Sequence, residues 1–250
     1  GIARCNFYIN GVVSSNLVAE EVQNVYLAEA YAIRALLYFN LVRFFGPVPL
    51  ETEPAEDLNK VYTRDSEEAI YNQIVADLLF AKEHLPATQV LTGKFTSGAA
   101  QGLLIKVYLT MAGSPLNKGL SHYTLALNEA TDFLAKVNNG TYKYGLESYY
   151  PKVFSETNEN NKEIVFDAQA IAGSQEGVRW GKWGGYGGPA NDFDQGSFGT
   201  PKVIPSFYKS YAANDNIRKK WNATDSTLRA NGTFNVSKVI SSFTIAKFRP

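Results

Sequence analysis

A long row of apolar residues at helical spacing, between residues 27 and 45, most constrains how this 250-residue chain folds. The row recurs every three or four positions, as expected for the buried face of an α-helix. Gly46 and Pro47 follow directly, and this pair favours ending the helix there. A second row of small residues lets another helix approach closely. The first row is Leu27, Ala30, Tyr31, Arg34, Leu37, Tyr38, Leu41 and Phe45, and the second is Ala28, Ala32 and Ala35.

Three further segments, at about residues 66–85, 96–112 and 123–137, show the same helical pattern. Gly98 and Gly102 lower the helix propensity of the middle segment, so close packing must offset that cost. The Asn-Asn-Gly sequence at 138–140 indicates a helix end and a turn. The residues expected to be buried are Ile70, Ile74, Leu78 and Ala81, then Ala99, Leu103, Val107 and Tyr108, and finally Leu125, Ala126, Ala130, Phe133 and Leu134.

Successive helices with small packing faces predict a mainly α fold, a tetratricopeptide-repeat-like scaffold of helical pairs, over residues 1–162. Residues 163–250 are predicted to be a loop-rich, ligand-side region of the same domain. This region contains a long loop at 173–199, a short helix at 205–211 and a few short strands, at about 163–167 and 243–248. Because the chain begins at Gly1 and stops at Pro250 after a strand-like run, we expect it to be truncated at both ends.

The composition excludes several classes of function. Lys and Arg together number 24, as do Asp and Glu, and a chain with no net charge lacks the basic face that nucleic-acid binding needs. No apolar run reaches about 18 residues, so the sequence predicts no membrane-spanning segment. The one cysteine, Cys5, excludes an intrachain disulfide and a cysteine-based metal cluster.

The 173–199 loop carries the strongest candidates for ligand contact. Flat aromatic rings match the apolar C–H face of a sugar ring, and polar neighbours match its hydroxyl groups. Glycines allow the backbone to come close to a ligand. The alternatives are that these rings pack the loop itself or contact a partner protein. The candidate residues are Arg179, Trp180, Trp183, Tyr186, Asn191 and Asp192.

Other motifs are weaker. Asp192, Asp194 and Gly196 resemble part of a calcium loop but lack its downstream Glu, so no cofactor is expected and a structural Ca²⁺ is left open. No carboxylate–His–nucleophile order and no Gly-x-Ser-x-Gly elbow occurs, which favours a protein that is not an enzyme.

Arg34 lies on an apolar helical row and therefore needs a buried partner of opposite charge. The candidates are Glu20 and Glu29.

Residues 28–50 read AEAYAIRALLYFNLVRFFGPVPL and resemble the signature of the SusD/RagB-like family. That signature has Glu-Ala, Arg-Ala and Tyr-Phe on one helix, followed by a Phe-Gly-x-Val-Pro turn. Blocks at 2–6, 63–78, 99–109, 163–166, 215–219 and 246–249 resemble later or earlier parts of the family pattern in the same order. The block around Cys5 matches the middle of a helix rather than a lipid-attachment site.

The resemblance implies a nutrient-binding lipoprotein of the starch-utilisation-system type. Such proteins lie on the outer membrane facing the cell exterior, held by an N-terminal lipid anchor that is absent from this chain. They capture an oligosaccharide, or sometimes a peptide, and deliver it to a SusC-like TonB-dependent transporter barrel without carrying out a reaction. The alternative is a peptide- or protein-binding helical-repeat scaffold, in which the aromatic loop belongs to the interface.

Overall fold

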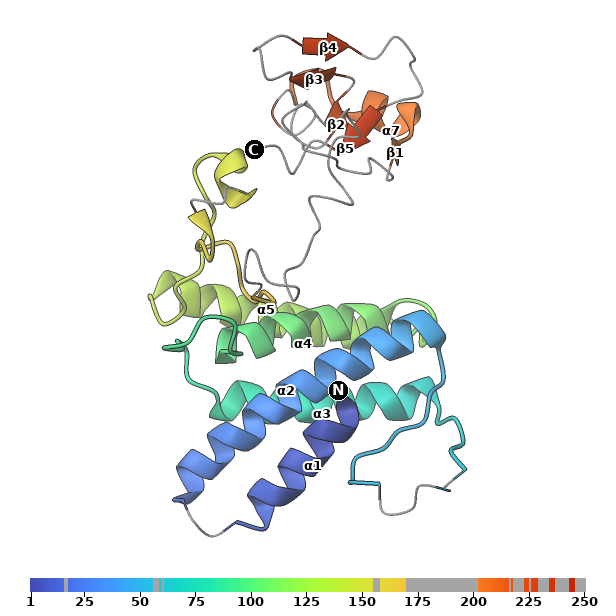
Figure 1. Ribbon diagram of the computed structural model, residues 1–250, viewed down its shortest axis with the longest axis vertical. Helices are drawn as coiled ribbons and strands as arrows, with labels where there is room; N and C mark the ends of the chain where they lie inside the picture. The colour runs from blue at the N-terminus through green and yellow to red at the C-terminus, as the bar shows by residue number, and fades with distance from the viewer. Residues whose placement is uncertain are drawn as a thin grey trace. The chain divides into compact units, whose positions relative to one another are not determined.

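The computed structural model describes residues 1–15, 18–55, 59, 61–154, 158–169, 202–215, 217, 223–224, 226–228, 234–236 and 243–245 (Figure 1). It divides into two compact units. The first comprises Gly1–Gly145 and Ile164–Ala168, and the second comprises Leu146–Glu163 and Gln169–Pro250. The boundary expected between residues 162 and 163 stays a prediction.

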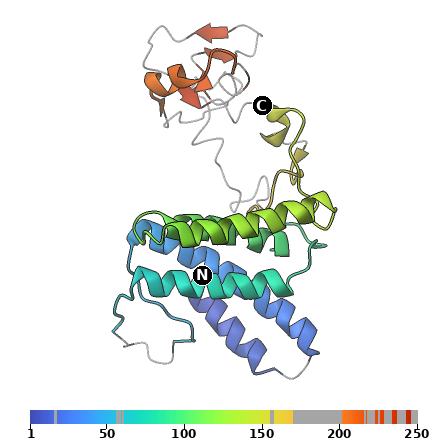
Figure 2. The same ribbon diagram turned by 180° about the vertical axis from the view of Figure 1, so that it is seen from behind.

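The described part of the first unit is helical. Its helices are α1 (Ile2–Val13), α2 (Glu20–Phe45), α3 (Glu67–His84), α4 (Ser97–Ala112) and α5 (Leu120–Asn138). Each helix packs against the next one in the chain, as Figures 1 and 2 show from opposite sides. This stepwise packing is typical of helical-repeat scaffolds. It confirms the mainly α, tetratricopeptide-repeat-like fold that the sequence predicts.

Local sequence signals set the helix ends. The hydroxyls of Ser66 and Thr96 cap α3 and α4, because each accepts a hydrogen bond from the backbone N–H three residues later, at 3.2 and 3.0 Å. Gly46 follows α2 with φ of 65°, and Gly140 follows α5 with φ of 80°. Glycine adopts these backbone angles without strain, which explains why both predicted helix ends are confirmed.

The predicted apolar rows form the core. Ala28, Ala32 and Ala35 of α2 are fully buried, as are all the residues expected on the inner face of α3. Gly98 of α4 lies against Tyr144, and a Cβ atom on Gly98 would lie 2.6 Å from the Cε2 atom of that ring. Close packing therefore explains why glycine stands at position 98 in spite of its low helix propensity, as predicted. A Cβ atom on Gly102 would be 3.5 Å from Val165, an ordinary contact.

Three residues expected in the core are exposed. Phe45, the last residue of α2, is 67% exposed, and Leu125 and Leu134 of α5 are 40% and 58% exposed. Among the described helices, α5 packs chiefly against α4, and Ala126 is its one buried residue. The predicted inner face of α5 was therefore too wide, because a helix with one main neighbour buries only a narrow row of residues.

The strand predicted at residues 163–167 is wrong. The segment Ile164–Ala168 returns to the first unit without pairing to another described strand. Val165 packs against the helical core, and Phe166 stacks on Phe95 with ring centroids 3.9 Å apart. The apolar run that favoured a strand therefore packs its side chains on the helical core and on the segment between α3 and α4.

Among the described helices, only α2 is long and apolar enough to cross a membrane by length and composition. The sequence predicts no membrane-spanning segment, because no uninterrupted apolar run reaches about 18 residues. Half of the apolar stretch is buried inside the protein, and the charged residue Arg34 lies buried on the same helix. Packing against α1 and α3 accounts for the apolar character of α2.

The second unit contains short elements. They are the 3₁₀ helix η1 (Tyr150–Phe154), β1 (Lys202–Val203), α7 (Pro205–Ser210), β2 (Ala223–Thr224), β3 (Ser226–Leu228), β4 (Phe234–Val236) and β5 (Phe243–Ile245). β5 lies between β1 and β2 in an antiparallel sheet, and β3 pairs with β4 in a second antiparallel sheet. These elements confirm the predicted short helix and the few short strands. The strand expected at 243–248 is found over its first three residues, and the rest lies outside the described residues.

Candidate functional site

The predicted ligand-binding residues are not among those the structure describes. Arg179, Trp180, Trp183, Tyr186, Asn191 and Asp192 all lie outside the described residues, and so do Asp194 and Gly196 of the calcium hypothesis. Their role in binding stays a prediction. The described residues contain a cavity in the first unit that the sequence did not predict.

This cavity, of about 270 Å³, opens where α1 begins, beside the loop that follows α2. Its lining combines apolar side chains with two carboxylates and two tyrosines. Among the lining residues that the structure describes, none is a His, Cys or Lys. An apolar lining with a few polar groups suits binding of a small group. The lining residues are Ile2, Ala3, Asn6, Tyr38, Pro49, Glu51, Glu53, Ala55 and Tyr62.

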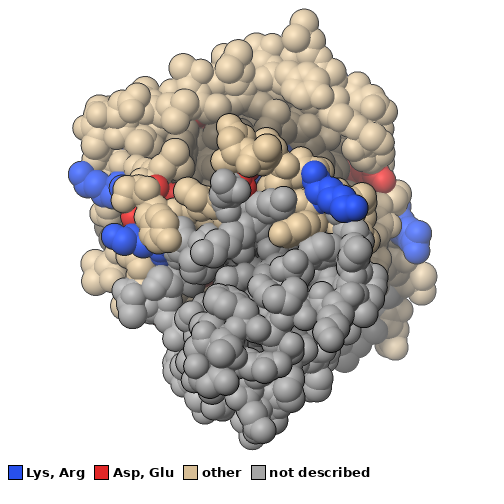
Figure 3. All heavy atoms as spheres, turned by 90° about the horizontal axis from the view of Figure 1, so that it is seen from above, with Lys and Arg blue, Asp and Glu red and all other residues tan. Residues whose placement is uncertain are grey.

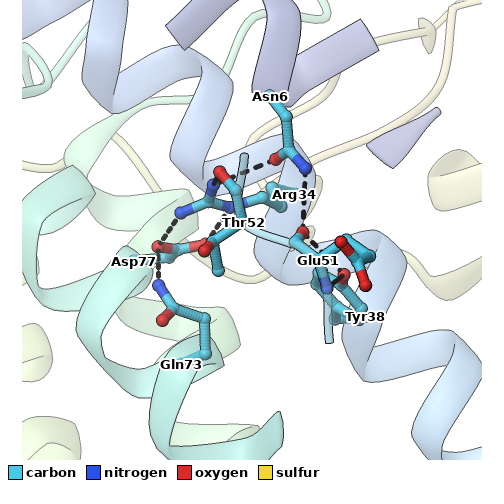
Figure 4. A network of polar contacts seen from close by, with 7 residues as sticks. All are labelled: Asn6, Arg34, Tyr38, Glu51, Thr52, Gln73 and Asp77. Carbon is cyan, nitrogen blue, oxygen red and sulfur yellow. Dashed lines mark hydrogen bonds and ion pairs between the residues drawn. The ribbon is translucent and has the colours of Figure 1, made fainter. Parts of the chain in front are cut away.

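A buried ion pair lies next to the cavity, because Arg34 bonds the lining residue Asn6. Figure 4 shows the pair and its contacts. Nε and Nη2 of Arg34 donate to the two carboxylate oxygens of Asp77, each at 2.8 Å. Nη1 of Arg34 donates to Oδ1 of Asn6 at 3.0 Å and to the carbonyl of Thr52 at 3.1 Å. Gln73 donates to Asp77 at 2.8 Å. The guanidinium thus joins α1, α2, α3 and the loop after α2.

Burial alone would lower the pKa of Arg34, because it disfavours the charged form. The hydrogen bonds from Arg34 to Asp77 and the charge of that carboxylate outweigh this effect, and the pKa of Arg34 is raised above its ordinary value. The guanidinium therefore stays charged inside the protein. A permanently charged Arg that makes four hydrogen bonds inside the protein acts as a structural link.

Asn6 and Tyr38 hold the loop that forms one wall of the cavity. Nδ2 of Asn6 donates to the carbonyls of Glu51 and Glu53 at 2.8 and 3.1 Å. The hydroxyl of Tyr38 donates to the Glu51 carbonyl at 2.8 Å and accepts from the Glu51 N–H at 2.7 Å. Buried side chains of α1 and α2 thus replace the secondary structure that this segment lacks.

The sequence identified Arg34 as a buried residue that needs a partner, but the proposed partners were wrong. The partner is Asp77, and Glu29 instead pairs with Lys94 at 2.9 Å. A signal for Asp77 was present in the sequence, since it lies on the apolar row of α3, three residues after Ile74. An acidic residue in such a row requires a buried cation, just as Arg34 requires an anion.

Other chemistry is sparse in the part that the structure describes. It holds no group of three or more His, Cys, Asp or Glu side chains that could bind a metal. Neither His84 nor His122 lines the cavity. On the face that Figure 3 shows, Lys, Arg, Asp and Glu of the described part are scattered among uncharged side chains. This pattern agrees with the balanced charge of the chain.

Comparison with known proteins supports the resemblance inferred from the sequence. Residues 1–109 match the SusD-like family model described as "Starch-binding associating with outer membrane". A SusD-like protein of Bacteroides ovatus is 32% identical over 176 residues, which are 68% of this chain and 31% of that protein. SusD-like protein P25 of Formosa agariphila is 25% identical over 235 residues, which are 92% of this chain and 41% of that protein.

Solved structures match over almost the whole chain. A SusD superfamily protein from Parabacteroides distasonis has a TM-score of 0.82 and 28% identity, covering 99% of this chain and 53% of that one. A second structure, described as being with xylogluco-oligosaccharide, has a TM-score of 0.78 and 24% identity, covering 98% of this chain and 50% of that one. The chain thus spans from a third to about half of the length of these relatives. The signature at residues 28–50, the family model and the helical fold agree that this chain belongs to the SusD-like family.

Proposed function

We propose that this protein captures an oligosaccharide at the cell surface and delivers it to a TonB-dependent transporter in the outer membrane. The observation that carries the proposal is the likeness of almost the whole chain to a SusD superfamily structure. A second structure of the same fold, described as being with xylogluco-oligosaccharide, supports it. The family description, which joins starch binding to the outer membrane, supports the same function.

The proposed binding residues are those of the 173–199 loop. Trp180, Trp183 and Tyr186 would stack on the C–H faces of sugar rings, while Arg179, Asn191 and Asp192 would bond the hydroxyls. Such contacts are individually small, so the affinity is expected to lie between micromolar and millimolar, roughly 4–8 kcal/mol. Binding needs no bond to break, so the proposal assigns no catalytic residue.

The location and the partner are also proposals. A lipid anchor in the N-terminal part of the full protein would hold it on the outer membrane, facing the exterior. Cys5 does not fit the role of anchor, because its side chain is buried in α1. The partner is a SusC-like transporter barrel, to which the protein would pass its ligand. No cofactor enters this scheme, and a structural Ca²⁺ near Asp192 stays a hypothesis.

The experiment is a titration of the full chain with xylogluco-oligosaccharide and with malto-oligosaccharides, following Trp fluorescence and heat. Saturable binding that weakens about tenfold in Trp180→Ala or Trp183→Ala would support both the function and its site. Tyr123→Ala is the control, because this half-exposed tyrosine lies on α5. Binding that neither Trp variant changes would overturn the site, and absence of binding to any glycan tested would overturn the function.

A helical-repeat scaffold that binds a peptide is the second candidate, since each helix of the first unit packs on its neighbour as in such proteins. It predicts saturable binding of a peptide and no response to sugars. A fluorescently labelled peptide library, tested by polarisation on the same preparation, separates the two functions. Release of reducing ends from xyloglucan or starch would instead indicate an enzyme.

A further inference from the structure

Two half-exposed tyrosines gather around an ion pair on the surface of the first unit. Nζ of Lys94, in the segment between α3 and α4, donates to both carboxylate oxygens of Glu29 on α2, at 2.9 and 3.2 Å. Tyr26 lies three residues before Glu29 on the same helix, and Tyr8 comes from α1. The side chains of Tyr8 and Tyr26 are 46% and 39% exposed. We call Tyr8, Tyr26, Glu29 and Lys94 the tyrosine platform.

Electrostatic coupling shows that the platform is one cluster. Burial raises the pKa of Tyr8 most, the nearby Glu29 and Tyr26 raise it further, and Lys94 lowers it. The pKa of Lys94 is raised chiefly by its hydrogen bond to Glu29, and Tyr26 and Tyr8 add to this rise. Tyr8 and Lys94 therefore each lie within the electrostatic reach of the other three groups.

The platform rests on a packed base. Cys5 and Ile9 of α1 pack with Leu27 and Ala30 of α2 in a buried cluster, and these residues neighbour the platform residues along both helices. Among the described residues, none forms a hydrogen bond with the hydroxyl of Tyr8 or Tyr26. Packed helices thus carry both tyrosines, and a substantial part of each residue is exposed to solvent.

We propose that the tyrosine platform is a second oligosaccharide-binding surface, separate from the 173–199 loop. This inference rests on the proposed function, glycan capture. The two phenol rings offer flat apolar faces for the C–H groups of sugar rings. The ammonium of Lys94 can donate to sugar hydroxyls, and the carboxylate of Glu29 can accept from them.

The surface can hold more than one sugar unit. Val22 and Ile33 share the exposed side of α2 with Tyr26, at helical spacing, and are 43% and 44% exposed. The eleven residue steps from Val22 to Ile33 extend about 16 Å along the helix axis. An extended oligosaccharide could therefore lie along α2. The cavity near Tyr38 is a different place, since Tyr26 and Tyr38 are about 18 Å apart along the same helix.

A protein partner fits the platform less well. The fully buried centre of a protein interface is depleted in Lys and Glu, because both charges lose their hydration there. Here the ion pair of Lys94 and Glu29 lies among the aromatic rings, and the side chain of Lys94 is 40% exposed. A sugar brings hydroxyl groups to both charges, so the ammonium and the carboxylate stay hydrogen-bonded when the ligand covers them.

The test uses affinity gels that contain xyloglucan or amylopectin, with the full chain and three variants. Tyr8→Ala/Tyr26→Ala removes the platform rings, Trp180→Ala/Trp183→Ala removes the loop rings, and Tyr123→Ala is the matched control on α5. The platform variant is expected to lose affinity for the polymer by about tenfold, since two stacking contacts are removed. Its circular dichroism and unfolding midpoint should stay near those of the unaltered chain, because the replaced rings are half exposed.

The outcomes separate the two proposals. Retardation that persists in the loop variant but weakens in the platform variant supports the platform and contradicts the loop as the sole site. Retardation that weakens in both supports two surfaces that act together. A platform variant that binds as the unaltered chain does overturns this inference and leaves glycan capture intact. If the unaltered chain is not retarded by either polymer, both proposals are wrong.

Discussion

Arg34 and Asp77 form a doubly hydrogen-bonded ion pair that joins α2 to α3, with both N–O distances at 2.8 Å. Only 4% and 3% of the two side chains is exposed to solvent. A planar guanidinium facing both oxygens of a carboxylate is among the strongest pairings of side chains in proteins. Since Arg34 also reaches Asn6 and Thr52, this pair fixes the loop beside the cavity as well as two helices.

Removal of one partner should destabilise the protein strongly. Asp77→Ala leaves the guanidinium of Arg34 buried without its anion, so we expect the free energy of unfolding to fall by about 3–5 kcal/mol. Urea unfolding, followed by circular dichroism, measures the change. The double variant Arg34→Met/Asp77→Leu serves as the control, because it removes both charges and should recover much of the loss. If the single variant loses less than about 1 kcal/mol, the pair is not as buried as described.

The sequence predicted one half of this network. Arg34 lies on an apolar helical row, and that position alone showed that it needs a partner. The partner comes from α3 and not from α2, because long side chains on neighbouring helices meet across their packing face. Spacing along one helix cannot reveal such a contact. Asp77 is an acidic residue in the apolar row of α3, just as Arg34 is a basic residue in the apolar row of α2. Matching these two charged residues with each other would have predicted the contact.

Gly98 and Gly102 form a matched pair of sites on α4. A Cβ atom at Gly98 would lie 2.6 Å from Tyr144, whereas one at Gly102 would lie 3.5 Å from Val165. In a helix interior alanine is favoured over glycine by about 1 kcal/mol. We therefore expect Gly102→Ala to stabilise the protein by up to about 1 kcal/mol and Gly98→Ala to destabilise it by about 1–3 kcal/mol, because the aromatic ring must move.

The measurement is the urea midpoint of each variant against the unaltered chain. Gly98→Ala/Tyr144→Ala, compared with Tyr144→Ala alone, is the control for the cause of the loss. Without the Tyr144 ring, the nearest remaining atom is Cδ2 of Tyr142 at 3.3 Å, so the added methyl group should cost much less. The interpretation fails if Gly98→Ala is as stable as Gly102→Ala, because the ring would then move aside at no cost.

Asp132 should make the first unit sensitive to acid. Hydrogen bonds from Lys136 and Gln101 lower the pKa of Asp132 below its usual 3.8. A carboxyl whose pKa is lower in the folded protein than in the unfolded chain stabilises the fold above the unfolded value. This stabilisation is lost as the pH falls from about 4 through the lower folded pKa. We expect Asp132→Asn to lack this part of the pH dependence.

Thermal unfolding midpoints measured between about pH 2 and pH 7 would show the difference. In Lys136→Met the folded pKa of Asp132 should rise, because the largest favourable hydrogen bond is gone. The loss of stability in acid should then be smaller and should end nearer to pH 4. Identical acid profiles for the unaltered chain and Asp132→Asn would mean that other carboxyls determine the acid stability.

More of the fold than of the candidate site could be predicted from the sequence. Helix rows, caps and glycine stops depend on local spacing, so α3 and α4 were predicted almost to the residue from Ser66, Leu85 and Thr96. The cavity depends on side chains from α1, α2 and the loop after α2, which meet through long-range hydrogen bonds such as that from Asn6 to Glu51. Local patterns carry little information about such contacts, and Phe166 shows the same limit, since its partner Phe95 lies on a distant segment.

Cys5 should be almost inert toward thiol reagents while the protein is folded. Its side chain is 8% exposed in α1, and burial raises its pKa above 9.0. Only the thiolate reacts, so both the burial and the raised pKa slow the reaction. At pH 8 we expect Ellman's reagent to react at least about a hundredfold faster in denaturing urea than in buffer, because native reaction needs local opening. Cys5→Ser is the control, since it removes the signal altogether. Equal rates in both conditions would mean that α1 separates from α2 in the native protein, and the base of the tyrosine platform would then be too mobile to hold a ligand.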